Sequence, residues 1–600
     1  MAVLEQFDYI FAIGMIFAFL DAWNIGAVIL FPALLNPLLI PKTGANDVAN
    51  SFATSVSSRS LTMKQAMMIA TVMEFGGAVG VGARVADTIR GKILSTKAFE
   101  AEPSVLMLGM TCALVSSSLY LTLATRLGLP VSTTHSIIGG VIGVGIAAIG
   151  GDGVNWGWNG VSQVFAAWVI APGIAGAFAA ILFLITKYGV MKRKNPVRAA
   201  LISIPFYFGL TTGLLTMLIV WKGAASASAA VKTWGPGQYV GVIFGTAIGC
   251  ALLSAIFLLP FLYRKLVLND WQLYWWHIPQ GPLLLRRGEV PPNTSGREII
   301  QNYYKGHKTR AELDAEGSDN VKTQPSDDVE SKTNEDTNEK HGISFVSPAS
   351  SDIGSSTRDE TAATPVITNE EPISAKPWYE PKTLLATAKR IFFHGVSVDV
   401  VAEQKKSSIL TGNLEAMHAR ATHYDNKAEH TYSFLQVLTA ATASFAHGAN
   451  DVSNAVGPLA AIYFIWHTGS IQSKSPVPVW ILCYGAGALV IGLWTYGYNI
   501  MRNLGNRLTL HSPSRGFCME LGSAITVIMA TRLALPVSTT QCIVGATVGV
   551  GLVNGDVKSI NWRMVGWIYM GWIITLPITG IISGCLMGLI LNAPRWGMGV

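Results

Sequence analysis

Long apolar stretches with few charged residues recur along most of this chain and alternate with short polar segments. Residues 199–220 and 240–263 are two of the clearest, and neither contains a charged side chain. A helix needs about 20 apolar residues to cross the hydrocarbon core of a bilayer. The pattern predicts membrane-spanning helices at about 7–26, 61–83, 105–125, 161–186, 199–221, 239–263, 478–500, 514–531 and 562–591. The chain is therefore predicted to be an all-α polytopic membrane protein with about 12 transmembrane segments.

Two regions predict interrupted helices rather than simple crossings. Residues 137–150 are apolar, but the run is too short and too rich in glycine for an easy full crossing. We expect a re-entrant or discontinuous half-helix there, which a membrane protein tolerates only where protein or water surrounds the backbone. Residues 434–450 and 455–467 are predicted to be two pieces of one broken span.

Two strings of residues occur twice, in the same order. GANDVAN at 44–50 is matched by GANDVSN at 448–454, and RLGLPVSTTH at 126–135 is matched by RLALPVSTTQ at 532–541. The aspartate of the first string precedes the serine of the second by 85 residues in one copy and by 87 in the other. Chance does not produce this agreement. The chain is an internal duplication, and the duplicated parts carry its polar chemistry.

The duplication divides the chain into a first transmembrane half (1–263), a linker (264–432) and a second transmembrane half (433–600). From 311 to 371 the linker is acidic, rich in serine and threonine and poor in large apolar residues, which is typical of disorder. The basic loop at 187–198 marks the cytoplasmic side, on which we also expect the linker. An odd number of crossings before the second copy would give two inverted-topology repeats.

Composition changes this picture little. Half of the residues are apolar, 13% are charged and 60 are glycine, which fits closely packed helices in lipid. The formal charge of +7 is distributed as in a membrane protein and does not indicate nucleic-acid binding.

Residues 27–44 interrupt the first copy of the duplication. Without these 18 residues, Gly26 would join Ala45, and the flanking sequence would fall into register with the second copy. We interpret the segment as foreign to the repeat, such as a short in-frame intron kept in the gene prediction. A true insertion is the alternative, and the sequence of the mature transcript distinguishes the two.

The duplicated PVSTT strings predict an anion site. Serine or threonine is a favoured helix N-cap, and a preceding proline suits the turn, so one such string would be ordinary capping. Two strings, each before a short glycine-rich helix at membrane depth, indicate more, because a helix N-terminus offers free N–H groups and a positive dipole end. We expect a small tetrahedral oxyanion there. The candidate anion-binding residues are Ser132, Thr133, Thr134, Ser538, Thr539 and Thr540, joined by Asn46 and Asn450.

The duplicated aspartates predict a cation site. A carboxylate within a membrane costs about 2.5 kcal/mol or more, so it usually marks function. Carboxylate, amide and unwound backbone carbonyl oxygens are suitable ligands for Na⁺. The candidate sodium ligands are Asp47, Asp451, Asn50 and Asn454. The alternative is that each aspartate only caps a helix at the membrane interface.

Glu74 and Glu520 are further acids within predicted spans, and they do not occupy equivalent places in the two copies. Each could take part in ion coupling, or could be a buried, protonated structural acid. Arg515 could pair with Glu520 or flank the bilayer. His135 and His447 adjoin the motifs, although single histidines are more often structural.

With the RGFCMEL segment at 515–521, the paired GANDVAN, GANDVSN and PVSTT strings resemble the inorganic phosphate transporter (PiT) family, and most of all its fungal plasma-membrane members. The resemblance implies a homodimeric, multi-pass sodium–phosphate symporter with inverted repeats and both termini outside the cell. It implies no enzymatic activity and no cofactor beyond the co-transported sodium. It places phosphate at the half-helix starts, sodium at the Asp–Asn pairs, and phosphate-coupling roles on Glu74 and Glu520.

Three other functions stay open at this point. The same fold could be coupled to protons, or could carry another tetrahedral oxyanion such as sulfate. Two membrane carboxylates also suggest an intramembrane aspartyl protease, but the Gly-x-Gly-Asp pattern of such enzymes is absent from the sequence. A phosphate sensor that signals through the linker is the third.

Overall fold

The structure is a computed structural model, and it describes most of both predicted halves. The described residues are 4–26, 47–83, 93–158, 160–220, 234–293, 296–315, 400–404, 410–471, 477–496, 501, 503–533, 535 and 537–593. The insert predicted at 27–44 and most of the linker lie outside them. The described residues up to Leu313 and from Val400 onward belong to one compact unit.

The described elements are helical, apart from one isolated bridge between Leu94 and Val154. The first half contains α1 (Asp8–Gly26), α3 (Val48–Ser57), α4 (Met63–Val81), α6 (Pro103–Arg126), α7 (Thr133–Ala148), α8 (Val161–Thr186), α9 (Pro196–Leu218), α12 (Pro236–Leu253) and α13 (Leu259–Leu266). The later part contains α16 (Val400–Gln404), α17 (Leu414–Ala419), α18 (Asn426–Thr468), α19 (Val479–Tyr496), α21 (Pro513–Arg532), α22 (Thr539–Val553) and α23 (Trp562–Asn592). This is the predicted all-α class.

Six described segments are long and apolar enough to cross a membrane. They are Glu5–Asn24, Pro103–Arg126, Val161–Met191, Pro196–Leu218, Pro236–Leu266 and Trp562–Asn592. The apolar helices α7 and α22 are shorter, with 16 and 15 residues, as expected for half-helices. The multi-pass membrane protein is confirmed, and the total of about 12 segments stays a prediction.

The predicted break between 450 and 455 is wrong. α18 runs as one helix of 43 residues through the whole GANDVSN string and includes Pro458. Proline has no N–H group to bond the carbonyl four residues earlier, so Pro458 leaves the Asn454 carbonyl without its helical partner. The helix continues because its middle is buried against other helices. The Asn454 carbonyl oxygen nevertheless lacks its usual backbone hydrogen bond.

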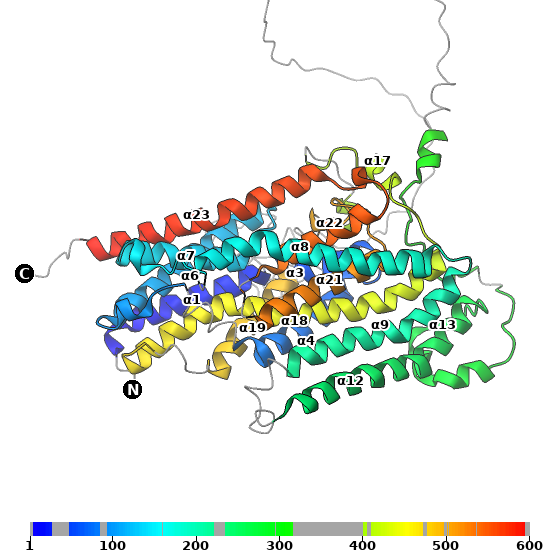
Figure 1. Cartoon of the computed structure of the whole chain (residues 1–600), viewed down its shortest axis with the longest axis horizontal. Helices are drawn as coiled ribbons and strands as arrows, with labels where there is room; N and C mark the ends of the chain where they lie inside the picture. The colour runs from blue at the N-terminus through cyan, green and yellow to red at the C-terminus, as the bar shows by residue number, and fades with distance from the viewer. Residues whose placement is uncertain are drawn as a thin grey trace, which may run out of the picture. The chain divides into compact units, whose positions relative to one another are not determined.

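The first copy runs antiparallel to the second along α18. The Leu4 N–H donates to the Trp466 carbonyl near one end of α18. After α3, the Ser58 and Ser60 hydroxyls donate to Gln436 near the other end, at 2.7 and 2.5 Å. The long helices lie with their axes roughly parallel, and the start of α1 and the end of α23 lie at the same end of the bundle (Figure 1). This orientation is the one that an inverted repeat requires.

Each half-helix packs against a long helix of the opposite half. α7 lies on α23, and α22 lies on α8. Glycines allow both contacts: a methyl group added at Gly143 would lie 2.0 Å from the Gly580 carbonyl oxygen, and one added at Gly549 would lie 2.2 Å from that of Gly176. Each half of the chain therefore holds the half-helix of the other half, an arrangement called here the exchange of half-helices.

The described ends of the linker pack on the same end of the helices. The buried Arg264, in the last turn of α13, forms an ion pair of 2.7 Å with the buried Asp270. The Tyr304 hydroxyl donates to Glu429 of α18 at 2.8 Å, and Gln404 of α16 donates to the Ser57 hydroxyl at the end of α3, also at 2.8 Å. Both ends of the linker thus touch helices that carry the duplicated motifs. The boundaries of the linker as a separate region stay a prediction.

Candidate functional site

The two PVSTT strings begin α7 and α22, as their sequences predict. Ser132 caps α7 and accepts the His135 N–H at 3.2 Å, and Ser538 caps α22 and accepts the Gln541 N–H at 3.4 Å. The Thr540 hydroxyl lies 3.4 Å from the carbonyl of Val131. The two strings are therefore neighbours in space, although about four hundred residues separate them in the chain.

The first carboxylate of the pair stands at the start of a helix. Asp47 is the N-cap residue of α3, but its side chain makes no capping bond. Its Oδ1 accepts hydrogen bonds from Asn50 and from the Thr540 hydroxyl, both at 2.9 Å. Its Oδ2 is buried and has no hydrogen-bond partner among the described residues. The alternative that Asp47 only caps a helix is therefore wrong.

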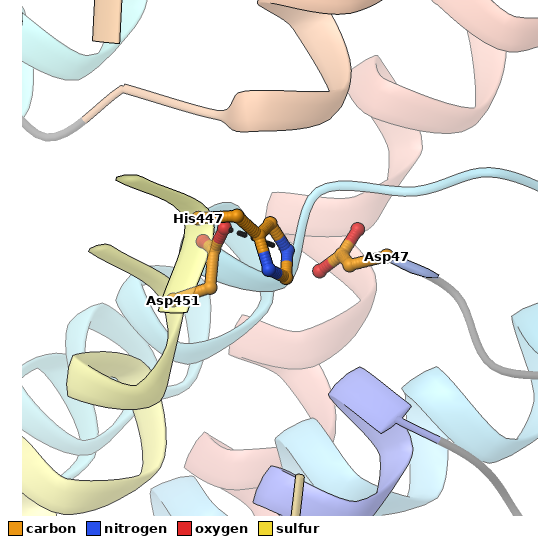
Figure 2. A group of neighbouring side chains, drawn as sticks. All are labelled: Asp47, His447 and Asp451. Carbon is orange, nitrogen blue, oxygen red and sulfur yellow. Dashed lines mark ion pairs between the residues drawn. The ribbon is translucent and has the colours of Figure 1, made fainter. Parts of the chain in front are cut away.

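The second carboxylate lies in the middle of α18 and is held on both oxygens. Asp451 Oδ1 accepts from Asn450 and Asn454, each at 3.2 Å. Its Oδ2 accepts from the Thr539 hydroxyl at 2.7 Å. His447 Nε2 lies 3.1 Å from the same oxygen, one helical turn away (Figure 2).

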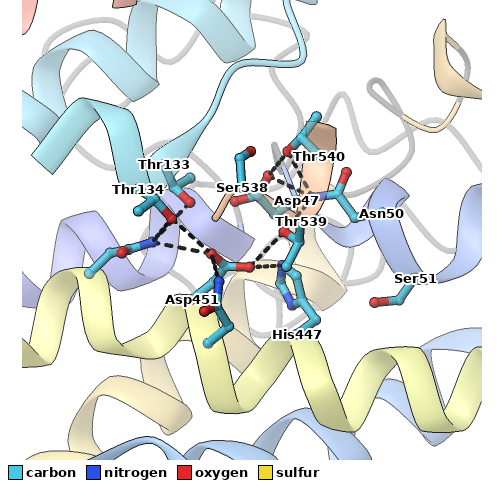
Figure 3. Close-up of polar contacts among 12 residues, drawn as sticks. Asp47, Asn50, Ser51, Thr133, Thr134, His447, Asp451, Ser538, Thr539 and Thr540 are labelled. Atoms are coloured by element: carbon cyan, nitrogen blue, oxygen red, sulfur yellow. Dashed lines mark hydrogen bonds and ion pairs between the residues drawn. The ribbon is translucent and has the colours of Figure 1, made fainter. Parts of the chain in front are cut away.

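The asparagines of the two copies reach across to the opposite half. Asn50 of the first half donates to the Thr539 and Thr540 hydroxyls at 3.2 and 2.9 Å. Asn454 of the second half donates to the Thr133 and Thr134 hydroxyls, at 3.1 and 3.3 Å. Figure 3 shows the resulting cluster, in which both aspartates face the starts of both half-helices. Asn450 lies beside it and donates to the Val537 carbonyl at 3.2 Å.

Nearly all predicted site residues that are described come together in this cluster. Asn46 lies outside the described residues. All members are buried, and the most exposed, Asn50 and Thr539, have an exposed fraction of only 5%. The cluster is therefore buried inside the protein.

Unused oxygen atoms in the cluster fit a cation. Asp47 Oδ2, Asn50 Oδ1 and Asn454 Oδ1 are buried and have no hydrogen-bond partner among the described residues. One ligand atom each of Asp47, His447 and Asp451 lies within 4.8 Å of the others. Burying such acceptors without a partner is costly, so the donor set favours a bound ion with oxygen ligands.

His447 is a site residue that the sequence interpretation treated as structural. Its Nδ1 lies 2.7 Å from Glu74 Oε2, while its Nε2 faces Asp451, so the imidazole bridges the two acids. The Ser444 hydroxyl also donates to Glu74, at 2.9 Å. The spacing of four residues between His447 and Asp451 places both on one helix face, and this signal was present in the sequence.

Glu520 lies outside the cluster and makes a separate hydrogen-bond network. Its carboxylate accepts from Thr54 and Ser55 of α3 and from Gln436 and Thr439 of α18. The suggested pairing with Arg515 is wrong. The Arg515 guanidinium instead donates to the Thr422 carbonyl and, at 3.0 Å, to Asn554. Arg515 therefore holds the end of α22 rather than the acid.

These features define a class of protein. Buried acids that face the starts of two half-helices, inside a multi-pass helical membrane protein, are typical of secondary transporters. The profile of the Phosphate transporter family matches residues 43–583, and the chain belongs to this family. The resemblance recognised in the sequence is thereby confirmed, and the family is one of transporters, not of enzymes.

Individual relatives agree with this assignment. The chain is 55% identical to the phosphate-repressible phosphate permease pho-4 of Neurospora crassa, with 99% of each chain covered. It is 29% identical to sodium-dependent phosphate transporter 2 of Felis catus, covering 91% of this chain and 95% of that one. Sodium-dependent phosphate transporter 1 of Homo sapiens is 27% identical, with 90% and 92% covered.

A solved structure described as "The sodium-dependent phosphate transporter" has the same fold. It superimposes with a TM-score of 0.63 at 24% sequence identity and covers 98% of this chain and 100% of its own.

Proposed function

We propose that this protein is a sodium-coupled symporter that imports inorganic phosphate across the plasma membrane by alternating access. The Neurospora relative is a phosphate permease, and the two mammalian relatives are sodium-dependent phosphate transporters. The observation that carries the proposal is the meeting of the two PVSTT strings beside two buried Asp–Asn pairs.

Phosphate binds at the starts of α7 and α22 in this proposal. Two helix N-termini converge there, and each supplies free backbone N–H groups and the positive end of a helix dipole. The hydroxyls of Thr133, Thr134, Thr539 and Thr540 add further donors. In the described arrangement these hydroxyls bond the aspartates and asparagines, so they must turn to reach a bound anion.

Sodium binds between the two aspartates. Asp47 Oδ2, Asn50 Oδ1, Asn454 Oδ1 and the Asn454 carbonyl released by Pro458 supply the oxygen ligands. A sodium ion there neutralises carboxylates that would otherwise repel phosphate. Each ion lowers the electrostatic cost of burying the other in a low-dielectric site, which couples their transport.

Transport requires this closed cluster to open to one side at a time. The antiparallel run of the two copies gives two similar structural units of opposite orientation, which can move against each other around the cluster. Glu74 contacts the cluster through His447, and Glu520 contacts it through α3. Cation binding in the cluster can therefore alter the positions of the helices that carry these two acids.

The remaining parts of the proposal concern assembly and orientation. We place the linker in the cytoplasm and both termini outside, because the basic loop after α8 lies on the linker side. We also propose a homodimer, which light scattering of the purified protein in detergent tests.

Phosphate uptake in yeast that lacks its own phosphate transporters tests the function. Radiolabelled phosphate is supplied in sodium medium and then with choline replacing sodium, with the chain expressed both in full and without residues 27–44. Uptake that collapses in choline is the expected result. Uptake that ignores sodium and rises with acidity would move the assignment to proton coupling. A surface-expressed protein without uptake would favour a sensor.

A further inference from the structure

Asp21 is a further buried carboxylate of the first half, outside the cluster described above. It lies on α1, and its side chain has an exposed fraction of 0%. Neither Oδ1 nor Oδ2 has a hydrogen-bond partner among the described residues. A membrane-embedded carboxylate is costly, and one without donors is the most costly form, so the position calls for a compensating group.

α1 packs against α6, and the contact between them contains polar groups of both helices. Asn24 donates to the Ser118 carbonyl and to Thr122, and the Ser118 hydroxyl donates to the Phe17 carbonyl. These groups are therefore occupied with one another. They make the contact between α1 and α6 polar without supplying a donor to Asp21.

Ser117 is differently placed. Its hydroxyl donates to the Ser136 hydroxyl of α7 at 3.0 Å, which leaves its own lone pairs unused by that bond. Asp21 shares its face of α1 with the two α1 residues that bond Ser118 of α6. Asp21 therefore faces α6 beside Ser117, the chain neighbour of Ser118.

The second half has no counterpart of this arrangement. The register that aligns Gly26 with Gly448 places Ala443 of α18 where Asp21 stands in α1. Asp21 is therefore a feature of one half only, and the duplicated motif does not account for it.

We propose that Asp21 and Ser117 bind a sodium ion of their own, in addition to the sodium at Asp47 and Asp451. The Asp21 carboxylate supplies the charge and two oxygens, and the Ser117 hydroxyl supplies a third. The ion sits against the first turn of α7 through the Ser117–Ser136 bond, so its binding favours the placement of the half-helix that carries Thr133 and Thr134. This proposal rests on the sodium-coupled function above.

Direct counting of bound sodium in the purified full-length protein tests it. Equilibrium binding of ²²Na⁺ with saturating phosphate is measured for the wild type, Asp21→Asn and Asp152→Asn, which removes an exposed carboxylate in the loop after α7. We expect Asp21→Asn to bind one sodium ion fewer per chain and Asp152→Asn to match the wild type. In uptake assays, Asp21→Asn should lower the Hill coefficient for sodium and raise the half-saturating sodium concentration about tenfold.

An unchanged number of bound ions in Asp21→Asn would overturn the proposal and would indicate a proton on Asp21 instead. If Asp21→Asn does not fold, Ser117→Ala decides, because it should weaken sodium binding several-fold. An unaltered sodium titration in Ser117→Ala then overturns the proposal. A wild type whose uptake ignores sodium would instead refute the proposed function itself, so the two failures are distinguishable.

Discussion

The aspartates of the two duplicated strings have different backbone settings in the two halves. In the second half, Asp451 lies inside a continuous helix and has partners on both carboxylate oxygens. In the first half, Asp47 stands at the start of α3, with partners on one oxygen only. The two copies therefore keep the same chemical groups but hold them differently. Asp451 is held on both carboxylate oxygens, whereas Asp47 keeps one oxygen available for a ligand.

The largest expected effect comes from removing either charge. Asp47→Asn or Asp451→Asn should lower sodium-stimulated phosphate uptake about a hundredfold or more, because the neutral amide cannot compensate the cation. Initial uptake rates at several sodium concentrations measure this, normalised to protein at the cell surface. Asp152→Asn, an exposed carboxylate, is the matched control. A variant with wild-type sodium dependence would refute the assignment of the site.

A structural contrast tests the exchanged half-helices. Gly143→Ala would put a methyl group 2.0 Å from the Gly580 backbone oxygen, whereas a methyl group at Gly173 of α8 meets nothing within 4 Å. We expect Gly143→Ala to destabilise the protein by about 1–3 kcal/mol and Gly173→Ala to be neutral or slightly stabilising. Thermal unfolding of both variants in detergent measures the difference. Equal melting temperatures would mean that α7 and α23 are not packed this closely.

His447 sharpens the comparison, because only the second half has an imidazole beside its aspartate. The first half has Ile25 at the corresponding position. Replacing His447 by leucine breaks the bridge between Glu74 and Asp451 and leaves both acids with one buried partner fewer. We expect about a tenfold loss of uptake and a weaker apparent sodium affinity. His447→Gln, which keeps one amide donor, should retain more activity than His447→Leu, and the reverse order would contradict the bridging role.

The smallest expected effects are those of removing single threonine hydroxyls, and they should differ between Thr540 and Thr134. Thr540 donates to Asp47 at 2.9 Å and accepts from Asn50 at the same distance, whereas Thr134 lies 3.5 Å from Asp451. Thr540→Ala should therefore raise the half-saturating sodium concentration about fivefold, and Thr134→Ala about twofold. Sodium titrations of uptake compare them. Serine at each position restores the hydroxyl and should recover the wild-type value; failure of Thr540→Ser to do so would show that the methyl group matters instead.

Much of the site was predictable because it occurs twice. A hydroxyl before an apolar run is ordinary, but its repetition at matched spacing predicted the starts of α7 and α22, where Ser132 and Ser538 cap the helices. The apolar runs likewise predicted α6, α8 and α23 within a few residues. Length, hydropathy and capping are local properties, so the sequence reports them directly.

What escaped prediction depends on contacts between distant segments. Residues 434–450 and 455–467 were predicted to be two pieces of a broken span, yet burial of α18 keeps the helix continuous even through Pro458. The bridge from His447 to Glu74 and the reach of Asn50 to Thr540 join residues hundreds of positions apart. Nothing in local periodicity encodes which of two equivalent half-helices an asparagine will meet.

The exchange of half-helices bears on whether the two halves need a covalent connection. Because α7 is held by α23 and α22 by α8, the two halves are interlocked through the membrane rather than tied together by the linker. We therefore expect the peptide connection between them to be dispensable for cohesion. Two separately synthesised polypeptides, divided within residues 316–399, should find each other in the bilayer and assemble as one molecule.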